Sequence, residues 1–150
     1  MTDDTAYMRL ALEQAELAAQ TGEVPVGAVL VLEDGQLFSS HNAPISLHDA
    51  SAHAEMRVIR AACAATQNYR LIGSSLYVTL EPCAMCAGAI IHARIKRVIY
   101  AATDPKTGTV QSLYQLLSDK RLNHQPQVTA GILADESSMM LKQFFKHRRK

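Results

Sequence analysis

The chain has 150 residues, of which 48% are hydrophobic and 19% are charged, with a formal net charge of +1. This length suits one domain with a substantial core. No stretch approaches the ~20 apolar residues of a membrane span, and the acidic start MTDDTAYM is unlike a signal peptide. Three cysteines do not make a disulfide framework. We therefore expect a single domain over 1–150, in a reducing, cytoplasmic setting and without a membrane-embedded part.

Positive charge is concentrated at the C-terminal end. The segment 142–150 holds five of the fifteen Lys and Arg residues and no acidic residue. The rest of the chain therefore carries ten basic against fourteen acidic residues. A basic helix end on an acidic body indicates a polyanionic partner. The alternative is a solvated helix end, whose cations also suit the helix dipole.

The first part of the chain predicts a helix followed by a β-hairpin. Apolar residues at near-helical spacing cover 6–20, and a Thr-Gly pair ends that pattern. An apolar run over 25–32 is typical of a strand that is covered on both faces. The Asp-Gly pair that follows is a hairpin turn signal, so we expect 36–41 to return as a second strand.

Helical and strand patterns alternate through the rest of the chain. A polar loop over 42–52 is expected to lead into a helix that ends near residue 65, with Ser51 as its N-cap. Pro82 is expected to open a further helix that ends near residue 93. The other expected elements are strands over 76–80, 98–102 and 128–130, a turn-rich loop over 104–110, and helices over 113–117 and 135–145. This alternation indicates an α/β fold with helices on both sides of one sheet.

Two short motifs carry residues suited to metal chemistry. His53 and Glu55 form an H-x-E motif, and Cys83 and Cys86 follow Pro82 in a P-C-x-x-C motif. One imidazole and two thiolates supply three zinc ligands and leave a fourth position open, as in catalytic zinc sites. Glu55 is then a carboxylate that is not a ligand. Each motif alone is a weak signal, but together they match the signature of zinc-dependent nucleobase deaminases.

Zinc chemistry gives each of these residues a role. Cys83 and Cys86 lie at a predicted helix start, where the helix dipole favours thiolates. A zinc-bound hydroxide would attack the amino-bearing ring carbon of a substrate. Glu55 would act as proton shuttle, taking the proton of the water and passing protons to the ring nitrogen and the departing ammonia. A purely structural zinc site is the alternative, although Glu55 has no role in it.

The chain resembles the cytidine deaminase-like superfamily and, beyond the metal motif, the bacterial tRNA-specific adenosine deaminases. The matching stretches are EVPVGAVLV, SAHAEM, the segment from NYRLIG through EPCAMC to DPKTG, and GILADE followed by FFKHRR. The resemblance implies hydrolytic conversion of adenosine to inosine at the wobble position of tRNA. It also implies a three-layer α/β/α fold with a five-stranded mixed sheet, one Zn²⁺ per subunit, and a homodimer that binds the tRNA anticodon stem-loop.

The resemblance further implies three RNA contacts. Asn42 matches an asparagine that contacts the flipped nucleotide, and Asp104 falls in a loop that meets neighbouring anticodon nucleotides. Phe145 and the basic residues after it match a C-terminal helix that touches the RNA. Cys63 is expected to be an inert core thiol and His92 a helix-end or interface residue.

Two other functions remain open at this point. A deaminase of a small substrate, such as cytosine, guanine, cytidine or a deoxynucleotide, would have the same metal site. The basic, aromatic C-terminus and the DPKTG loop favour RNA over such a substrate. A zinc-stabilised RNA-binding module without catalysis is the third possibility, and Glu55 argues against it because binding alone needs no carboxylate beside an open zinc position.

Overall fold

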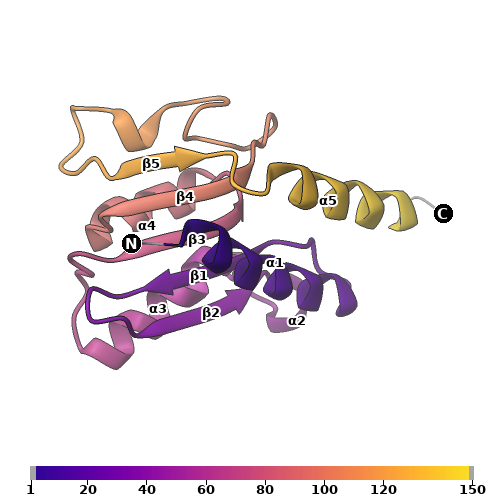
Figure 1. The fold of residues 1–150 in the computed structure, drawn as a ribbon, viewed down its shortest axis with the longest axis horizontal. Helices are drawn as coiled ribbons and strands as arrows, with labels where there is room; N and C mark the ends of the chain where they lie inside the picture. Colours follow the sequence, from indigo (N-terminus) through magenta and orange to yellow (C-terminus); the bar gives the residue numbers. More distant parts are fainter. Residues whose placement is uncertain (1–2, 149–150) are drawn as a thin grey trace.

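The strand order in the sheet is β2-β1-β3-β4-β5 in the computed structural model, which describes residues 3–148 (Figure 1). β1 pairs antiparallel with both β2 and β3, whereas β3 with β4 and β4 with β5 are parallel. The expected five-stranded mixed sheet is therefore confirmed. The strands are β1 (Gly27–Val31), β2 (Leu37–His41), β3 (Ser75–Leu80), β4 (Arg97–Ala102) and β5 (Gln127–Ala130).

Helices cover both faces of this sheet. α1 crosses the near face in Figure 1, α3 and α4 lie behind the strands, and α5 extends beyond the sheet. Together they make the expected three-layer α/β/α fold. The helices are α1 (Asp4–Gln20), α2 (Pro44–Leu47), α3 (Ala54–Thr66), α4 (Ala84–Ala93) and α5 (Ala134–Arg148). Among residues 3–148, no helix combines the length and apolar character that a membrane span requires.

The strands are apolar on both faces because each face packs against a different helical layer. In β1, Ala28 and Leu30 belong to the core beneath α3 and α4, whereas Val29 belongs to the core beneath α1. Tyr77 of β3 lies opposite Val29 and faces the same side. Gly27 lets α1 approach closely, because a Cβ atom there would collide with the carbonyl oxygen of Ala11. The continuous apolar run of β1 is therefore explained by the burial of this strand on both faces.

Two expected elements differ from the structure. The segment predicted as a polar loop contains the four-residue helix α2, which begins at Pro44. Such a short helix shows no apolar periodicity, so the sequence pattern cannot reveal it. The helix expected over 113–117 is instead a 3₁₀ turn over Leu116–Ser118.

Two expected helix starts were also placed wrongly. His53, not Ser51, is the N-cap of α3. The amide and hydroxyl of Ser51 both donate to Oδ1 of Asp49, at 2.9 and 2.7 Å. Pro82 lies one residue before Cys83, the N-cap of α4, rather than inside that helix. In both cases a residue of the two motifs, His53 or Cys83, occupies the N-cap position directly before its helix.

Candidate active site

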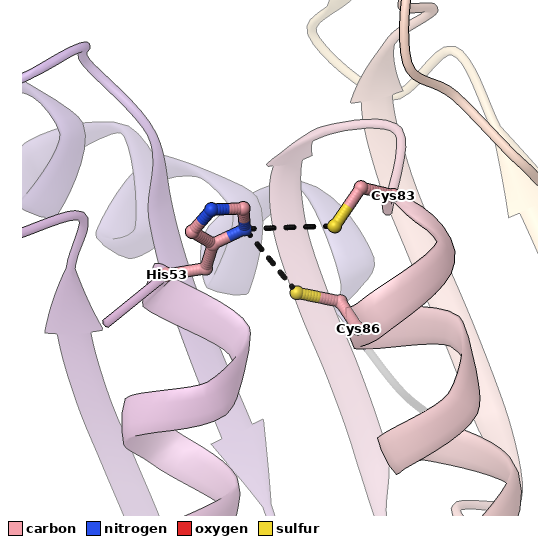
Figure 2. A group of neighbouring side chains, drawn as sticks. All are labelled: His53, Cys83 and Cys86. Carbon is pink, nitrogen blue, oxygen red and sulfur yellow. Dashed lines mark hydrogen bonds between the residues drawn. The ribbon is translucent and has the colours of Figure 1, made fainter. Parts of the chain in front are cut away.

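The two motifs meet where the parallel strands end. His53 is the N-cap of α3, and Cys83 is the N-cap of α4, directly after β3. Both caps have extended backbone, and their side chains face each other across the gap between the two helices (Figure 2). The loop that begins after β4 lies at the same end of the sheet, because β3 and β4 are parallel. Sites at the carboxyl ends of parallel strands are typical of α/β proteins.

The spacing of the three predicted ligands fits zinc. Nδ1 of His53 lies 3.6 Å from Sγ of Cys83 and 3.6 Å from Sγ of Cys86 (Figure 2). All three atoms lie within 4.8 Å of one another. A tetrahedral ion with Zn–S of about 2.3 Å and Zn–N of about 2.0–2.1 Å separates nitrogen from sulfur by about 3.6 Å. One nitrogen and two sulfur donors, grouped at this separation, therefore suit a zinc ion with one open position.

The two thiols differ in their ionisation. Hydrogen bonds with Cys86 and with His53 lower the pKa of Cys83 to about 4. The same contact with Cys83, together with burial, raises the pKa of Cys86. The hydrogen bond with Cys83 also raises the pKa of His53. The group thus holds a thiolate next to proton donors, and a metal ion would displace those protons when it binds.

Glu55 lies beside this group and is buried. Its side chain starts in the first turn of α3, and the residue is 4% exposed. The pKa of Glu55 is raised to about 7, chiefly by burial; the nearby Cys83 contributes to this increase and His53 opposes it. A carboxyl group with a pKa near neutrality can both accept and release a proton, which general acid–base catalysis requires.

A cavity of about 300 Å³ opens next to these residues. This volume is at the lower end of the range for small-molecule sites. The cavity is lined by Val24, Val26, Asn42, Pro44, His53, Glu55, Leu80, Glu81, Cys83, Asp104 and Thr107. The structure thus places His53, Glu55 and Cys83 around one cavity. Two of the three predicted RNA contacts, Asn42 and Asp104, line the same cavity.

The two predicted RNA contacts in the cavity also have structural partners. Asn42 is 8% exposed, and its Nδ2 donates to the carbonyl oxygen of Val24 at 3.3 Å. The Asp104 carboxylate accepts hydrogen bonds within its own loop, from the Lys106 amide and from the amide and hydroxyl of Thr107. Both side chains are therefore held in defined positions on the cavity wall.

Phe145, the third predicted RNA contact, lies on α5 and away from this cavity. It is 45% exposed, contacts Phe144 edge to face, and borders a surface hollow with Leu141, Lys142 and Lys146. Of the basic C-terminal residues, Arg149 and Lys150 lie outside the described residues. The structure does not bring Phe145 to the metal group, so an RNA contact there would be made at a distance from the reacting base.

Two buried glutamates that the sequence did not assign hold the walls of the cavity. Glu23, which is 0% exposed, accepts hydrogen bonds from the amides of Ile45 and Ser46 in α2, at 3.3 and 2.6 Å. Glu81 accepts hydrogen bonds from the loop after β4, including the Gln111 amide at 2.8 Å. Burial alone would raise the pKa of Glu81, but the donors of this loop outweigh it and lower the pKa to about 2. Most donors to the two glutamates are backbone amides, and one serine hydroxyl joins them in each case. Amides are common to nearly all residues, so no side-chain pattern in the sequence marks either contact.

The other two residues considered from the sequence lie outside the metal group. Sγ of Cys63 faces the carbonyl oxygen of Tyr69 at 3.7 Å, and burial raises the pKa of Cys63. Such a thiol is less reactive than a free one. His92 is exposed in the last turn of α4.

Comparison with known proteins identifies the family. Residues 1–102 match the family model for the cytidine and deoxycytidylate deaminase zinc-binding region. The chain is 46% identical over 150 residues to a tRNA-specific adenosine deaminase of Bacillus subtilis, a match that covers 100% of this chain and 93% of that protein. It is 48% identical over 149 residues to a tRNA-specific adenosine deaminase of Agrobacterium fabrum, which covers 99% of this chain and 98% of that protein.

Solved structures support the same assignment. A structure from a study of A-to-I editing by tRNA:A34 deaminases at the wobble position superimposes with a TM-score of 0.87 and 49% identity, over 91% of this chain and 99% of that chain. A guanine deaminase from Nitrosomonas europaea shares the fold, with a TM-score of 0.82 and 21% identity over 96% of this chain and 85% of that chain. The identity of 46–48% to the tRNA-specific adenosine deaminases, over nearly the full length, shows that the chain belongs to them, within the cytidine and deoxycytidylate deaminase family.

Proposed function

We propose that this chain hydrolyses the 6-amino group of adenosine at the wobble position of a tRNA anticodon, giving inosine and ammonia. The observation that carries the proposal is the group formed by His53, Cys83 and Cys86 at zinc spacing, next to the buried Glu55 and a cavity. The names of the relatives, which cover nearly the whole chain, support tRNA adenosine as the substrate.

The residues of the cavity divide the chemistry between them. When bound by the three ligands, zinc supplies a Lewis acid that lowers the pKa of a water molecule at its open position. Glu55 takes a proton from the attacking water as the water oxygen bonds to C6 of adenine, and it passes that proton to N1. Glu55 then carries the proton of the new C6 hydroxyl group to the amino nitrogen, so that ammonia leaves and the C6 carbonyl of inosine forms.

The cavity walls hold the base during these steps. We propose that Asn42 contacts the flipped nucleotide and that Asp104 meets a neighbouring anticodon nucleotide, because both line the cavity. An anticodon loop presents unpaired bases, so moving one into the cavity costs less than extracting it from a duplex. Phe145 and the basic end of α5 are proposed to contact RNA farther from the reacting base.

The remaining expectations follow from this function. We propose that residues 1–150 act as one zinc-dependent deaminase domain, with one Zn²⁺ per subunit and the basic end at 142–150. We also propose a cytoplasmic location, which a tRNA substrate supports. The homodimer implied by the family resemblance stays a prediction, which sedimentation of the purified protein would test.

The test is deamination of an anticodon stem-loop with adenosine at the wobble position, beside free adenosine, cytidine, cytosine and guanine. Inosine formed only in the stem-loop supports the proposal. Ammonia released from a free base or nucleoside, with an inert stem-loop, would overturn the RNA substrate and indicate a small-substrate deaminase. RNA binding without any turnover by the zinc-loaded protein would indicate a binding module.

A further inference from the structure

We infer that Glu81 is a positioning residue, whose carboxylate holds the 104–112 loop as one wall of the cavity and so sets the affinity for the substrate. Glu81 has no contact of its own with the reacting atoms in this proposal. It acts through the loop residues that it holds. The identity of the substrate, although not the anchoring of the loop, rests on the function proposed above.

The first observation is the number of donors that converge on this one carboxylate. Oε2 of Glu81 accepts hydrogen bonds from three consecutive amides, those of Val110, Gln111 and Ser112, at 3.0, 2.8 and 3.0 Å. Oε1 accepts from the amide of Asp104 at 3.0 Å and from the hydroxyl of Ser112 at 2.5 Å. A single side chain thus binds both the beginning and the end of the loop.

The second observation is that the anchor itself is fixed. Glu81 is 2% exposed, and its amide donates to the carbonyl oxygen of Ala102 at 2.8 Å, where the two parallel strands end. The next residue, Pro82, accepts hydrogen bonds from the amide and hydroxyl of Thr109, at 3.0 and 3.2 Å. Cys83 follows directly. The position of the loop is therefore defined relative to the segment that carries a metal ligand.

The third observation is what the loop contributes to the cavity. Asp104 and Thr107 line the same space as His53 and Glu55. The Asp104 carboxylate bonds only to groups at the loop tip in the described contacts, namely those of Lys106 and Thr107. These bonds shape the tip but do not tie it to the sheet. The loop is therefore held at the strand ends by Glu81, which binds residues 104 and 110–112, and by the carbonyl oxygen of Pro82, which binds Thr109.

Replacement of Glu81 by glutamine tests this connection without changing side-chain size. A glutamine can place its carbonyl oxygen at the Oε2 position and keep the three consecutive amide bonds. Its NH₂ group then faces the Asp104 amide, where two donors oppose each other. The hydroxyl of Ser112 can rotate and accept instead. Glu81→Gln should therefore release the beginning of the loop while the fold is kept.

The experiment compares Glu81→Gln with wild type and with Asp119→Asn. Asp119 is the matched control because its carboxylate also holds a turn, through the Arg121 amide at 3.0 Å, but lies outside the cavity lining. The measurements are kcat and KM on the anticodon stem-loop, zinc content, and amide hydrogen exchange of 104–112. For Glu81→Gln we expect KM to rise about tenfold or more, with kcat within about threefold, since binding and not the chemical step is affected. Zinc content should be unchanged, exchange at the start of the loop should be faster, and Asp119→Asn should match wild type.

An unchanged KM, or a loss of kcat at unchanged KM, would overturn the positioning role. Unchanged amide exchange in 104–112 would overturn the anchoring itself. Should Glu81→Gln fail to fold, Ser112→Ala removes only the hydroxyl donor to Oε1 and should raise KM in the same direction by a smaller factor. No change in KM for Ser112→Ala would then count against the proposal.

The same design separates this proposal from the proposed function. If wild type deaminates a free base and not the stem-loop, the RNA function fails, and the comparison of KM with kcat is made on that base. If wild type accepts none of the substrates, the amide exchange of 104–112 in wild type and in Glu81→Gln shows whether Glu81 anchors the loop. In both cases an unaffected Glu81→Gln variant overturns the inference drawn here.

Discussion

Gly108 lies directly against the carboxylate of Glu81. A Cβ atom at residue 108 would stand 2.5 Å from Oε1 of Glu81 and 2.6 Å from the carbonyl oxygen of Asp104. The Gly108 amide already donates to that carbonyl oxygen at 2.8 Å. Both distances to the added carbon are shorter than real contacts of this kind, so the loop can reach the carboxylate only with glycine at this position.

Gly108→Ala should therefore displace the loop. We expect a loss of about 1–3 kcal/mol in the free energy of unfolding, as for other substitutions that overfill a packed site, together with a higher KM on the stem-loop. Denaturant unfolding and steady-state kinetics measure the two effects. Gly88→Ala is the control, because an added Cβ there has no neighbour within 4 Å and the residue lies inside α4. It should stabilise the protein by about 0.5–1 kcal/mol and leave KM unchanged.

Glu55→Gln should abolish turnover and keep the metal. The glutamine has nearly the same shape but cannot carry the proton, and loss of a general acid–base group lowers rates by about 10²–10⁴-fold. Zinc content by atomic spectroscopy and single-turnover rates on the stem-loop make the measurement. A variant with near wild-type turnover would show that another group moves the proton, whereas loss of zinc would show that Glu55 supports the metal site.

Removal of a ligand should separate metal binding from folding. Cys83→Ala leaves one imidazole and one thiol, so zinc content should fall well below one per chain and activity should be lost. A ligand that binds only the folded state stabilises it, so chelation should lower the melting temperature of wild type. Chelation should not lower the melting temperature of the Cys83→Ala variant, which binds little zinc. An equal effect of the chelator on both proteins would argue against the predicted ligand set.

Asp4 should make part of the stability depend on pH. Burial opposes its ionisation, but hydrogen bonds from Arg97 at 2.8 Å and from the Tyr77 hydroxyl at 2.8 Å lower the pKa of Asp4 overall. A carboxyl group with a lowered pKa in the folded state stabilises that state above its unfolded pKa, and this contribution is lost as the pH falls through the folded pKa. Asp4→Asn should cost about 1–3 kcal/mol near neutral pH.

The difference in unfolding free energy between wild type and Asp4→Asn should shrink below about pH 4, where Asp4 becomes protonated in the unfolded chain and then in the folded one. Denaturant unfolding at several pH values measures it. A difference that stays constant from neutral to acidic pH would show that the charge of Asp4 does not contribute.

Charges on α5 should change the salt dependence of RNA turnover. Lys142 and Lys146 border the same surface hollow as Phe145. If each contacts a phosphate, its replacement by alanine reduces the slope of log(kcat/KM) against log salt by about 0.7, the value for a single-stranded contact. Wild-type activity that does not respond to salt would remove the argument for RNA binding by this helix.

Local patterns predicted the fold, and they singled out the three side chains that the structure groups together, His53, Cys83 and Cys86, because the decisive signals lie within short segments. The apolar spacing of α1 indicates a helix with one buried face, and the unbroken apolar run of β1 indicates a strand that is buried on both faces. The residues predicted as ligands also lie in short segments: Cys83 and Cys86 are one helical turn apart, and His53 is the N-cap of the other helix. Ser51 was chosen as the N-cap by residue type, but its side chain is bonded to Asp49 instead.

Contacts between distant segments could not be predicted in the same way. Glu81 meets amides that lie 23 to 31 residues farther along the chain, and amides are common to all these residues. Glu23 holds α2 through two backbone amides and the Ser46 hydroxyl. This helix has only four residues, which are too few to show an apolar period. Phe145 was placed near the RNA by resemblance alone, and its distance from the cavity depends on the direction in which α5 leaves the sheet (Figure 1).

The way in which Glu23 and Glu81 hold the cavity has a consequence for how such an enzyme can diverge. Their partners at residues 45, 46 and 110–112 are bound through backbone amides. Every residue except proline provides that amide. The hydroxyls of Ser46 and Ser112 add one hydrogen bond each. Mutation can therefore exchange exposed side chains of the walls while the amide contacts that set the course of the walls are kept. A descendant chain could accept a different base or a different RNA loop and still inherit the predicted metal ligands, Glu55 and both glutamates unchanged. Proline at any of these five positions would remove the amide that the glutamate binds.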